Sequence, residues 1–234
     1  MICLDIGNTN IVIGLYDNNN LYSVSRINTE QYHSLKKESD EVMAISSVVP
    51  KIEEFILQKF GNHLCFSISY LNSGITLKVD CPEEVGNDRL SNMKAIIESG
   101  LFPAIIIDFG SATTYDVIDE NGHFIGGAIA PGIDVSAKYL FEKAAQLEPV
   151  DFKFPSSVIA KNTATNLQSG IMYGGADAVN GMLERIKKEM NNNINNIILT
   201  GGFSMVLSKY ITHKHTVDPN LTLKGIRLIW EKNQ

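Results

Sequence analysis

Two turns, about a hundred residues apart, carry the same residue types and could each hold a phosphate. The first runs from Asp5 to Asn10 (Asp-Ile-Gly-Asn-Thr-Asn) and the second from Asp108 to Thr113 (Asp-Phe-Gly-Ser-Ala-Thr). In each turn the glycine lets backbone N–H groups approach an anion, hydroxyl or amide side chains add donors, and the leading aspartate can hold a cation or its water. One such turn is usually structural. Two in matching strand contexts predict a duplicated domain that binds one nucleotide.

A second group of reactive side chains, Gly86-Asn87-Asp88-Arg89, lies between the two turns. The glycine permits a substrate to approach the backbone closely, and Asp88 can accept a hydroxyl proton. The Arg89 guanidinium can donate two parallel hydrogen bonds to a substrate carboxylate. The same residues also suit a helix start, with Asn87 or Asp88 as the N-cap and Arg89 in a surface ion pair. At a helix start beside Arg89, Asp88 is expected to favour its ionised form and to be a weak base.

Apolar strands and amphipathic helices must position these groups. The apolar segments that flank each turn, 2–4 with 11–16 and 104–107 with 114–118, predict a β-hairpin around it. Further strands are expected at 21–26, 42–49, 122–130 and 197–199, and helices at 52–60, 88–99, 134–147, 167–190 and 220–228, with a short helix or surface loop at 28–40. This order predicts an α/β fold of two duplicated lobes, with residues 1–85 as an N-terminal ATPase-type lobe and 86–234 as a C-terminal lobe that includes the linker helix.

Other candidate chemistry is weaker. Thr200-Gly201-Gly202 ends a predicted strand, where a base or ribose could press against the backbone, although a plain strand-to-helix turn has the same residues. The histidines lie in polar segments and are interpreted as surface residues: His33, His63, His123, His213 and His215. Neither a Ser/His/Asp order nor a Cys/His dyad stands out, so covalent catalysis is not expected.

Composition narrows the class of protein further. The 234 residues carry a net charge of -6, and the lysines are scattered, which argues against nucleic acid as a partner. The three cysteines are odd in number and far apart, as expected in a reducing compartment. The first strand begins at residue 2, leaving no secretory leader, and no apolar run approaches the ~20 residues of a membrane helix. We therefore expect a cytoplasmic protein without membrane contact.

Taken together in chain order, the motifs resemble those of the type III pantothenate kinases. The resemblance runs along the whole chain and rests on seven motifs: Asp5 to Asn10, Ser46 to Pro50, Gly86 to Arg89, Asp108 to Thr114, Gly126 to Gly132, Asn162-Thr163 with Gln168 to Gly170, and Thr200 to Gly202. Each motif alone is weak, whereas seven in order are specific.

The resemblance implies the acetate and sugar kinase, Hsp70 and actin fold, and an enzyme that uses ATP to phosphorylate the primary hydroxyl of pantothenate, the first step of coenzyme A synthesis. It also implies a homodimer, a monovalent cation such as potassium or ammonium, and magnesium. The implied ATP ligands are Asp5, Ile6, Gly7, Asn8, Thr9, Asn10, Ile11, Val12 and Ser111. The implied pantothenate site has Val79, Gly86, Asn87, Asp88, Arg89 and Thr163, with Asp88 as proton acceptor, Thr163 reaching across the dimer and Asp108 binding potassium.

Three positions depart from the family pattern. Val79 stands where the family usually has a tyrosine, which predicts a weaker pantothenate pocket. Ser111 replaces a threonine and keeps the hydroxyl, and the 28–40 connection is short. The alternatives are a kinase for another small hydroxylated acid or a sugar, a non-catalytic nucleotide-binding regulator, and a filament-forming actin-like protein.

Overall fold

The computed structural model describes residues 1–36 and 41–234, which form two units. The first unit contains Met1–Phe102, Ile118–Gly126 and Asn220–Gln234, and the second contains Pro103–Val117 and Gly127–Pro219. This division differs from the predicted one, in which the N-terminal lobe ends at residue 85 and the C-terminal lobe begins at residue 86. The C-terminal segment returns to the first unit, and the chain crosses between the units more than once.

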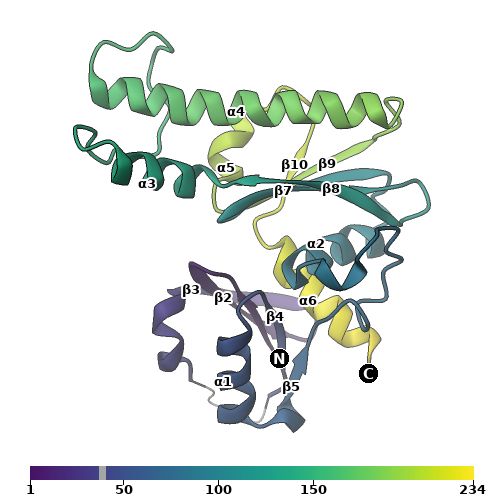
Figure 1. Ribbon diagram of the computed structural model, residues 1–234. Coiled ribbons are helices and arrows are strands. Elements are labelled where there is room, and N and C mark those ends of the chain that lie inside the picture. The colour runs from purple at the N-terminus through teal and green to yellow at the C-terminus, as the bar shows by residue number, and fades with distance from the viewer. Residues whose placement is uncertain (37–40) are drawn as a thin grey trace. The chain divides into compact units, whose positions relative to one another are not determined.

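The first unit is built on a five-stranded sheet with the order β3-β2-β1-β4-β5 (Figure 1). Its strands are β1 (Ile2–Ile6), β2 (Asn10–Asp17), β3 (Asn20–Asn28), β4 (Met43–Ser47) and β5 (Cys65–Ser67). β1 pairs antiparallel with β2 and parallel with β4, so the first predicted hairpin is confirmed. The short strand β5, parallel to β4, was not predicted because its three residues carry no clear periodicity.

Helices cover both faces of this sheet. Alternate side chains of β1 and β4, including Leu4 and Ile45, pack against α1 (Pro50–Phe60) through Ile52 and Ile56. On the other face Cys3 and Ala44 pack against α6 (Leu221–Lys232). This is the arrangement expected for parallel strands that are buried on both sides.

The linker helix α2 (Asn87–Glu98) packs against α6 within the first unit. The contact is so close that a Cβ at Gly225 of α6 would overlap the backbone of Ser91 in α2. The Thr222 hydroxyl of α6 also donates to Asn92 Oδ1 at 2.9 Å. These contacts assign α2 to the first unit. They join residues more than a hundred positions apart, which local sequence patterns do not reveal.

The second unit repeats the first. Its sheet has the order β10-β9-β6-β7-β8, which read from the other edge matches the chain order of the first sheet. The strands are β6 (Ala104–Phe109), β7 (Ala112–Ile118), β8 (Phe124–Pro131), β9 (Asn196–Gly201) and β10 (Thr216–Val217). The last residue of β7 and the first three residues of β8 are grouped with the first unit. β6, β9 and β10 are parallel, as β1, β4 and β5 are. The predicted duplication is therefore confirmed, although β10 was missed.

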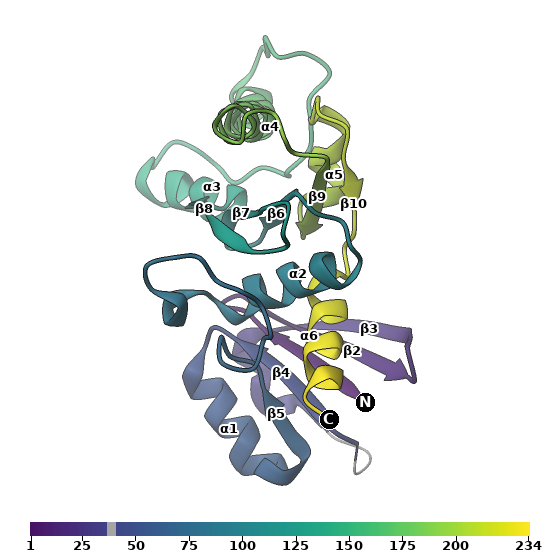
Figure 2. The ribbon, with the colours of Figure 1, turned by 90° about the vertical axis from the view of Figure 1, so that its right-hand side faces the viewer.

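Helix α4 (Thr163–Glu189) runs across one face of this sheet, with α3 (Ile133–Lys143) beside it (Figures 1 and 2). α4 begins four residues before the predicted start, because Asn162 caps it by accepting a hydrogen bond from the Thr165 N–H at 3.0 Å. α3 ends at Lys143 rather than at residue 147.

Short helical segments complete the two units: η1 (Thr29–Ser34), η2 (Asn62–Leu64), η3 (Pro82–Glu84), α5 (Ser204–Leu207) and η4 (Ser208–Tyr210). Of the predicted 28–40 segment, η1 supplies a helical turn, and residues 37–40 lie outside the described residues.

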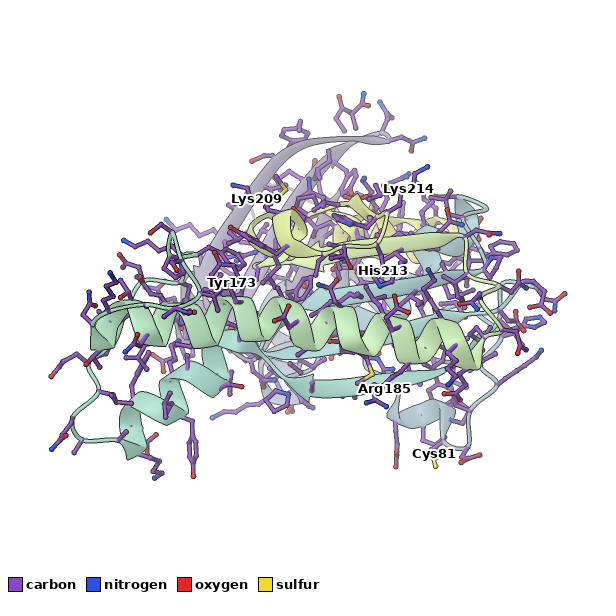
Figure 3. All side chains as sticks on the ribbon, turned by 90° about the horizontal axis from the view of Figure 1, so that it is seen from above. Cys81, Tyr173, Arg185, Lys209, His213 and Lys214 are labelled. Atoms are coloured by element: carbon purple, nitrogen blue, oxygen red, sulfur yellow. The ribbon has the colours of Figure 1, made fainter. Side chains whose placement is uncertain are left out.

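The loop after η4 lies beside α4 and is hydrogen-bonded to it (Figure 3). Asn180 of α4 donates to the Tyr210 carbonyl at 2.9 Å and accepts from the Thr212 N–H at 2.9 Å. His213 Nε2 lies 3.1 Å from Glu184 of α4, and the His213 side chain is only 9% exposed. His213 is therefore not the surface residue that its polar neighbours indicated. In the described part of the chain, no helix is both long and apolar enough to cross a membrane.

Candidate functional site

The first phosphate-type turn joins β1 to β2 and is closed by the Gly7 N–H, which donates to the Asn10 carbonyl at 3.0 Å. Thr29, a buried residue of η1, braces the turn: its hydroxyl donates to the Gly7 carbonyl at 2.8 Å, and its N–H donates to the Thr9 carbonyl at 3.0 Å. The side chains of Asn8 and Thr9 are exposed. Thr29 thus fixes the backbone of the turn, while the side chains of Asn8 and Thr9 face solvent.

The apolar members of the predicted ATP segment have a different position. The side chains of Ile6 and Ile11 are fully buried in the core, and Val12 is half-buried. These two isoleucines could contact a ligand only through backbone groups.

Asp5 is oriented from the neighbouring strand. In the parallel pairing of β1 with β4, Asp5 is the partner of Ser46, whose side chain is fully buried. The Ser46 hydroxyl donates to Asp5 Oδ1 at 3.3 Å. A half-buried carboxylate held in this way lies at the carboxyl end of β1, the edge of an open α/β sheet where ligands usually bind.

The start of α2 is joined to the same edge of the sheet. The Asn87 side-chain amide donates to the Ser47 carbonyl at 3.0 Å, and the Cα of Gly86 faces Val48, with a Cβ at that position lying 3.8 Å from Val48 Cγ1. The structure therefore brings the Asp5 turn and the Gly86 to Arg89 segment, about eighty residues apart, to the carboxyl ends of β1 and β4.

Asp88 lies over Gly86, and its Oδ1 accepts a hydrogen bond from the Arg89 N–H at 2.7 Å. Burial raises the pKa of the Asp88 carboxyl, and this effect outweighs the lowering by the Arg89 N–H and guanidinium. The expected lowering by Arg89 and the backbone N–H is present, but the expected net lowering of the pKa was wrong, because desolvation exceeds these contributions. A raised pKa makes the carboxylate a better proton acceptor.

The helix-capping interpretation of this segment is also wrong. The N-cap of α2 is Gly86, and no side chain of a described residue hydrogen-bonds as its cap. Asn87 instead reaches Ser47, and the half-buried Arg89 holds its guanidinium 5.4 Å from the ring centroid of Phe124.

Val79 follows a segment anchored to that same phenylalanine. The Lys78 N–H donates to the Phe124 carbonyl at 2.8 Å, and the Phe124 N–H donates to the Thr76 carbonyl at 3.0 Å. Val79 is half-buried just beyond these bonds. Phe124 thus connects the Val79 loop with Arg89 inside the first unit.

Asp108 occupies the equivalent of Asp5 in the second unit. It is the register partner of Thr200 in the parallel pair β6–β9. Gly201 has φ +85°, and a Cβ there would overlap the Asp108 carboxylate, so glycine is required for this carboxylate position. The Thr200 hydroxyl is buried and has no hydrogen-bond partner among the described residues.

Ser111 lies in an exposed turn that leaves no room for a side chain at Gly132. The Gly132 N–H donates to the Ser111 carbonyl at 3.0 Å, and a Cβ on Gly132 would lie 2.5 Å from the carbonyl oxygens of both Gly110 and Ser111. Gly132 is also the N-cap of α3. A helix start therefore meets the second phosphate-type turn, an arrangement that favours an anion.

The remaining predicted residue, Thr163, is the exposed first residue of α4 in the second unit. The predicted residues thus divide between the units: Asp5 to Val12, Val79 and Gly86 to Arg89 in the first, and Asp108, Ser111 and Thr163 in the second. Among residues 1–36 and 41–234, no three His, Cys, Asp or Glu side chains come together as a metal cluster.

Several residues that build the site were given no role from the sequence. Ser46 and Ser47 carried a signal, since two serines end an otherwise apolar strand. Thr29 and Phe124 carried none, because their contacts with Gly7 and Arg89 arise only in the folded chain.

Comparison with known proteins identifies the family of this chain. Residues 1–185 match the family described as type III pantothenate kinase. A type III pantothenate kinase from Brevibacillus brevis is 37% identical over 254 residues, covering 100% of this chain and 99% of the relative. One from Citrifermentans bemidjiense is 36% identical over 256 residues and covers 100% of both chains.

Solved structures share the fold. A Campylobacter jejuni protein named for the Baf family of transcriptional activators has a TM-score of 0.67 at 20% identity, covering 100% of this chain and 98% of that one. The archaeal actin homologue Ta0583 has a TM-score of 0.56 at 9% identity and covers 99% and 100%. The ROK hexokinase from Thermus thermophilus has a TM-score of 0.53 at 13% identity, covering 98% of this chain and 97% of that one. The fold is therefore that of the actin-like ATPases and sugar kinases, and the chain belongs to the type III pantothenate kinase family, whose members are kinases.

Proposed function

We propose that this protein transfers the γ-phosphoryl group of ATP to the primary hydroxyl of pantothenate, the first step of coenzyme A synthesis. A bond forms between the acceptor oxygen and γ-phosphorus as the bond from γ-phosphorus to the bridging oxygen of ADP breaks. The acceptor proton passes to Asp88. The products are 4'-phosphopantothenate and ADP.

The observation that carries this proposal is the convergence at the carboxyl ends of β1 and β4. There, a buried serine orients Asp5, and the Ser47 carbonyl holds the start of the helix that carries Asp88. Family membership supplies the substrate pair, and the first unit supplies a carboxylate that can accept a proton.

Asp88 suits direct phosphoryl transfer. Its transition state is largely dissociative, so the carboxylate mainly orients the hydroxyl and takes its proton late. Burial raises the pKa of Asp88 and so strengthens it as a proton acceptor. Arg89, beside it at the start of α2, would bind the pantothenate carboxylate, and the positive end of the helix would favour that anion.

The nucleotide and its cations fit the donors that are present. The Asp5 and Ser111 turns would hold the phosphates through backbone N–H groups and hydroxyls. Asp108, beside the buried Thr200 hydroxyl, has the oxygen ligands that a potassium or ammonium ion prefers. Magnesium would reach the site mainly through the phosphates, since it usually binds one or two protein carboxylates and retains waters.

We propose further that the protein is a cytoplasmic homodimer. Large apolar side chains stay exposed on the second unit: Ile129 of β8, and Val135, Tyr139 and Leu140 of α3. Where such exposed apolar groups gather into a patch, they mark an association surface. The three cysteines are free, as in a reducing compartment.

The direct test measures ADP release by purified protein with ATP, magnesium, potassium and pantothenate. Asp88→Asn should keep ATP-induced thermal stabilisation but lose ~10²- to 10⁴-fold in kcat, because an amide cannot accept the proton. Near-normal turnover in this variant would remove Asp88 from its role. ATP turnover that does not depend on pantothenate would instead show that pantothenate is not the acceptor.

A shared site can be tested by complementation. If Thr163 reaches pantothenate in the partner subunit's site, then mixing inactive Asp88→Asn with inactive Thr163→Val protein should restore activity, because heterodimers contain one intact site. Failure despite demonstrated subunit exchange would place Thr163 elsewhere.

Val79 favours one alternative, a different hydroxylated acid as acceptor, because a valine leaves space where the family usually has a tyrosine. A panel of small hydroxy acids and sugars, compared by kcat/KM, separates the two acceptors.

A further inference from the structure

The carboxyl end of β4 is a fixed point in the first unit. Its last residue, Ser47, is 7% exposed, and its hydroxyl both accepts from the Val49 N–H at 3.1 Å and donates to the Val49 carbonyl at 3.2 Å. The Val48 N–H also donates to the Ile6 carbonyl of β1 at 3.0 Å. The Ser47 carbonyl therefore has little freedom to move.

Asn87 ties α2 to this fixed point. Its side-chain nitrogen donates to the Ser47 carbonyl at 3.0 Å, and Asn87 is the first residue of the helix, directly before Asp88. The N-cap of α2 is Gly86, and no side chain of the described residues accepts a hydrogen bond as its cap. The first turn of α2 therefore lacks the hydrogen bond from an N-cap side chain that usually restrains a helix start. The Asn87 side chain therefore joins this turn to the sheet.

We propose that Asn87 is a positioning residue: it holds the first turn of α2 against β4 and thereby fixes the Asp88 carboxylate, rather than binding the acceptor itself. This inference rests on the proposed role of Asp88. It assigns Asn87 a different task from its neighbours, because its amide nitrogen points to a protein carbonyl.

Two variants test the role. Asn87→Ala removes the amide, and Asn87→Asp keeps the shape but puts a carboxylate oxygen against the Ser47 carbonyl. Since a misplacement of 1 Å can cost ~10²-fold in rate, we expect kcat to fall by ~10- to 100-fold in both, with the KM for pantothenate within about threefold of wild type. A KM increase of tenfold or more with kcat retained would make Asn87 an acceptor ligand and overturn the proposal.

A second readout needs no turnover. Loosening the first turn should hydrate Asp88, whose charged neighbour is Arg89 on α2. NMR titration of the Asp88 carboxyl in ligand-free protein should then show a lower pKa in Asn87→Ala than in wild type. An unchanged pKa in a folded variant would contradict the positioning role. This result stands even if pantothenate proves not to be the acceptor, so the two proposals fail separately.

The chain offers a matched control at the next strand. Asn72 donates to the Ser67 carbonyl at the end of β5 at 2.8 Å, the same type of bond without an adjacent Asp88. Asn72→Ala should lower Tm by an amount similar to Asn87→Ala while leaving kcat and the Asp88 pKa unchanged. An equal loss of kcat in both variants would show that the effect is general loosening of the unit, and the proposal would be lost.

Discussion

Gly86→Ala is expected to displace the Asp88 carboxylate without disturbing the backbone. Gly86 has φ −57° and ψ 144°, which alanine adopts freely. The added Cβ would lie 2.6 Å from Asp88 Oδ1, whereas ordinary van der Waals contact begins near 3.4 Å. The carboxylate must therefore move by about 0.8 Å, or the first turn of α2 must shift by a similar distance.

The size of the effect follows from this displacement. A misplacement of 1 Å can cost ~10²-fold in rate, so kcat should fall by roughly 30- to 100-fold. The free energy of unfolding should change by only about 1 kcal/mol, because the clash is with the end of a side chain that can rotate. The Arg89 N–H bond to Asp88 would be lost in the same movement.

The assay is steady-state ADP release at saturating ATP and pantothenate, together with thermal unfolding. Gly181→Ala is the control, because a Cβ there meets nothing within 4 Å. It should leave kcat unchanged and raise stability by up to ~1 kcal/mol, as expected for a helical glycine. A Gly86→Ala enzyme with kcat within threefold of wild type would refute the assignment of Asp88 or its position over Gly86.

Three further predictions concern the pocket, the cation and the response to pH. Val79→Tyr should lower the KM for pantothenate, by a factor corresponding to about 1 to 3 kcal/mol, and leave the KM for ATP nearly unchanged; loss of binding would show that the space is already filled. Activity should depend on potassium or ammonium and lose that dependence in Asp108→Asn, whereas full wild-type activity in sodium alone, with ammonium excluded, would contradict the cation role. Although burial opposes it, hydrogen bonds from the His123 and Asn121 N–H groups and from Lys78 together lower the pKa of Asp119 to about 2 from 3.8. The ionised Asp119 therefore stabilises the fold above pH 4, and this contribution is lost as pH falls from about 4 to 2. It amounts to about 1 kcal/mol of unfolding free energy after allowance for solvent screening. Asp119→Asn should flatten the stability–pH curve in that window.

Local patterns in the sequence were sufficient for most of the fold. Apolar alternation and glycine turns located both hairpins, and three-to-four spacing located α1, because these signals depend on near neighbours. The repeated Asp-x-Gly turns predicted the duplication, which the two matching sheets confirm. The shortest strands, β5 and β10, were missed because two or three residues carry no period.

Tertiary structure decided the rest. It moved α2 and α6 into the first unit through the contact at Gly225, and it raised the pKa of Asp88, which its neighbours in sequence alone would lower. It also gave Asn87 a carbonyl of β4 as partner, where sequence proximity indicated a helix cap. The physical reason is common to all three. Desolvation and close packing depend on residues far apart along the chain, whereas local patterns report only the neighbours within a few positions.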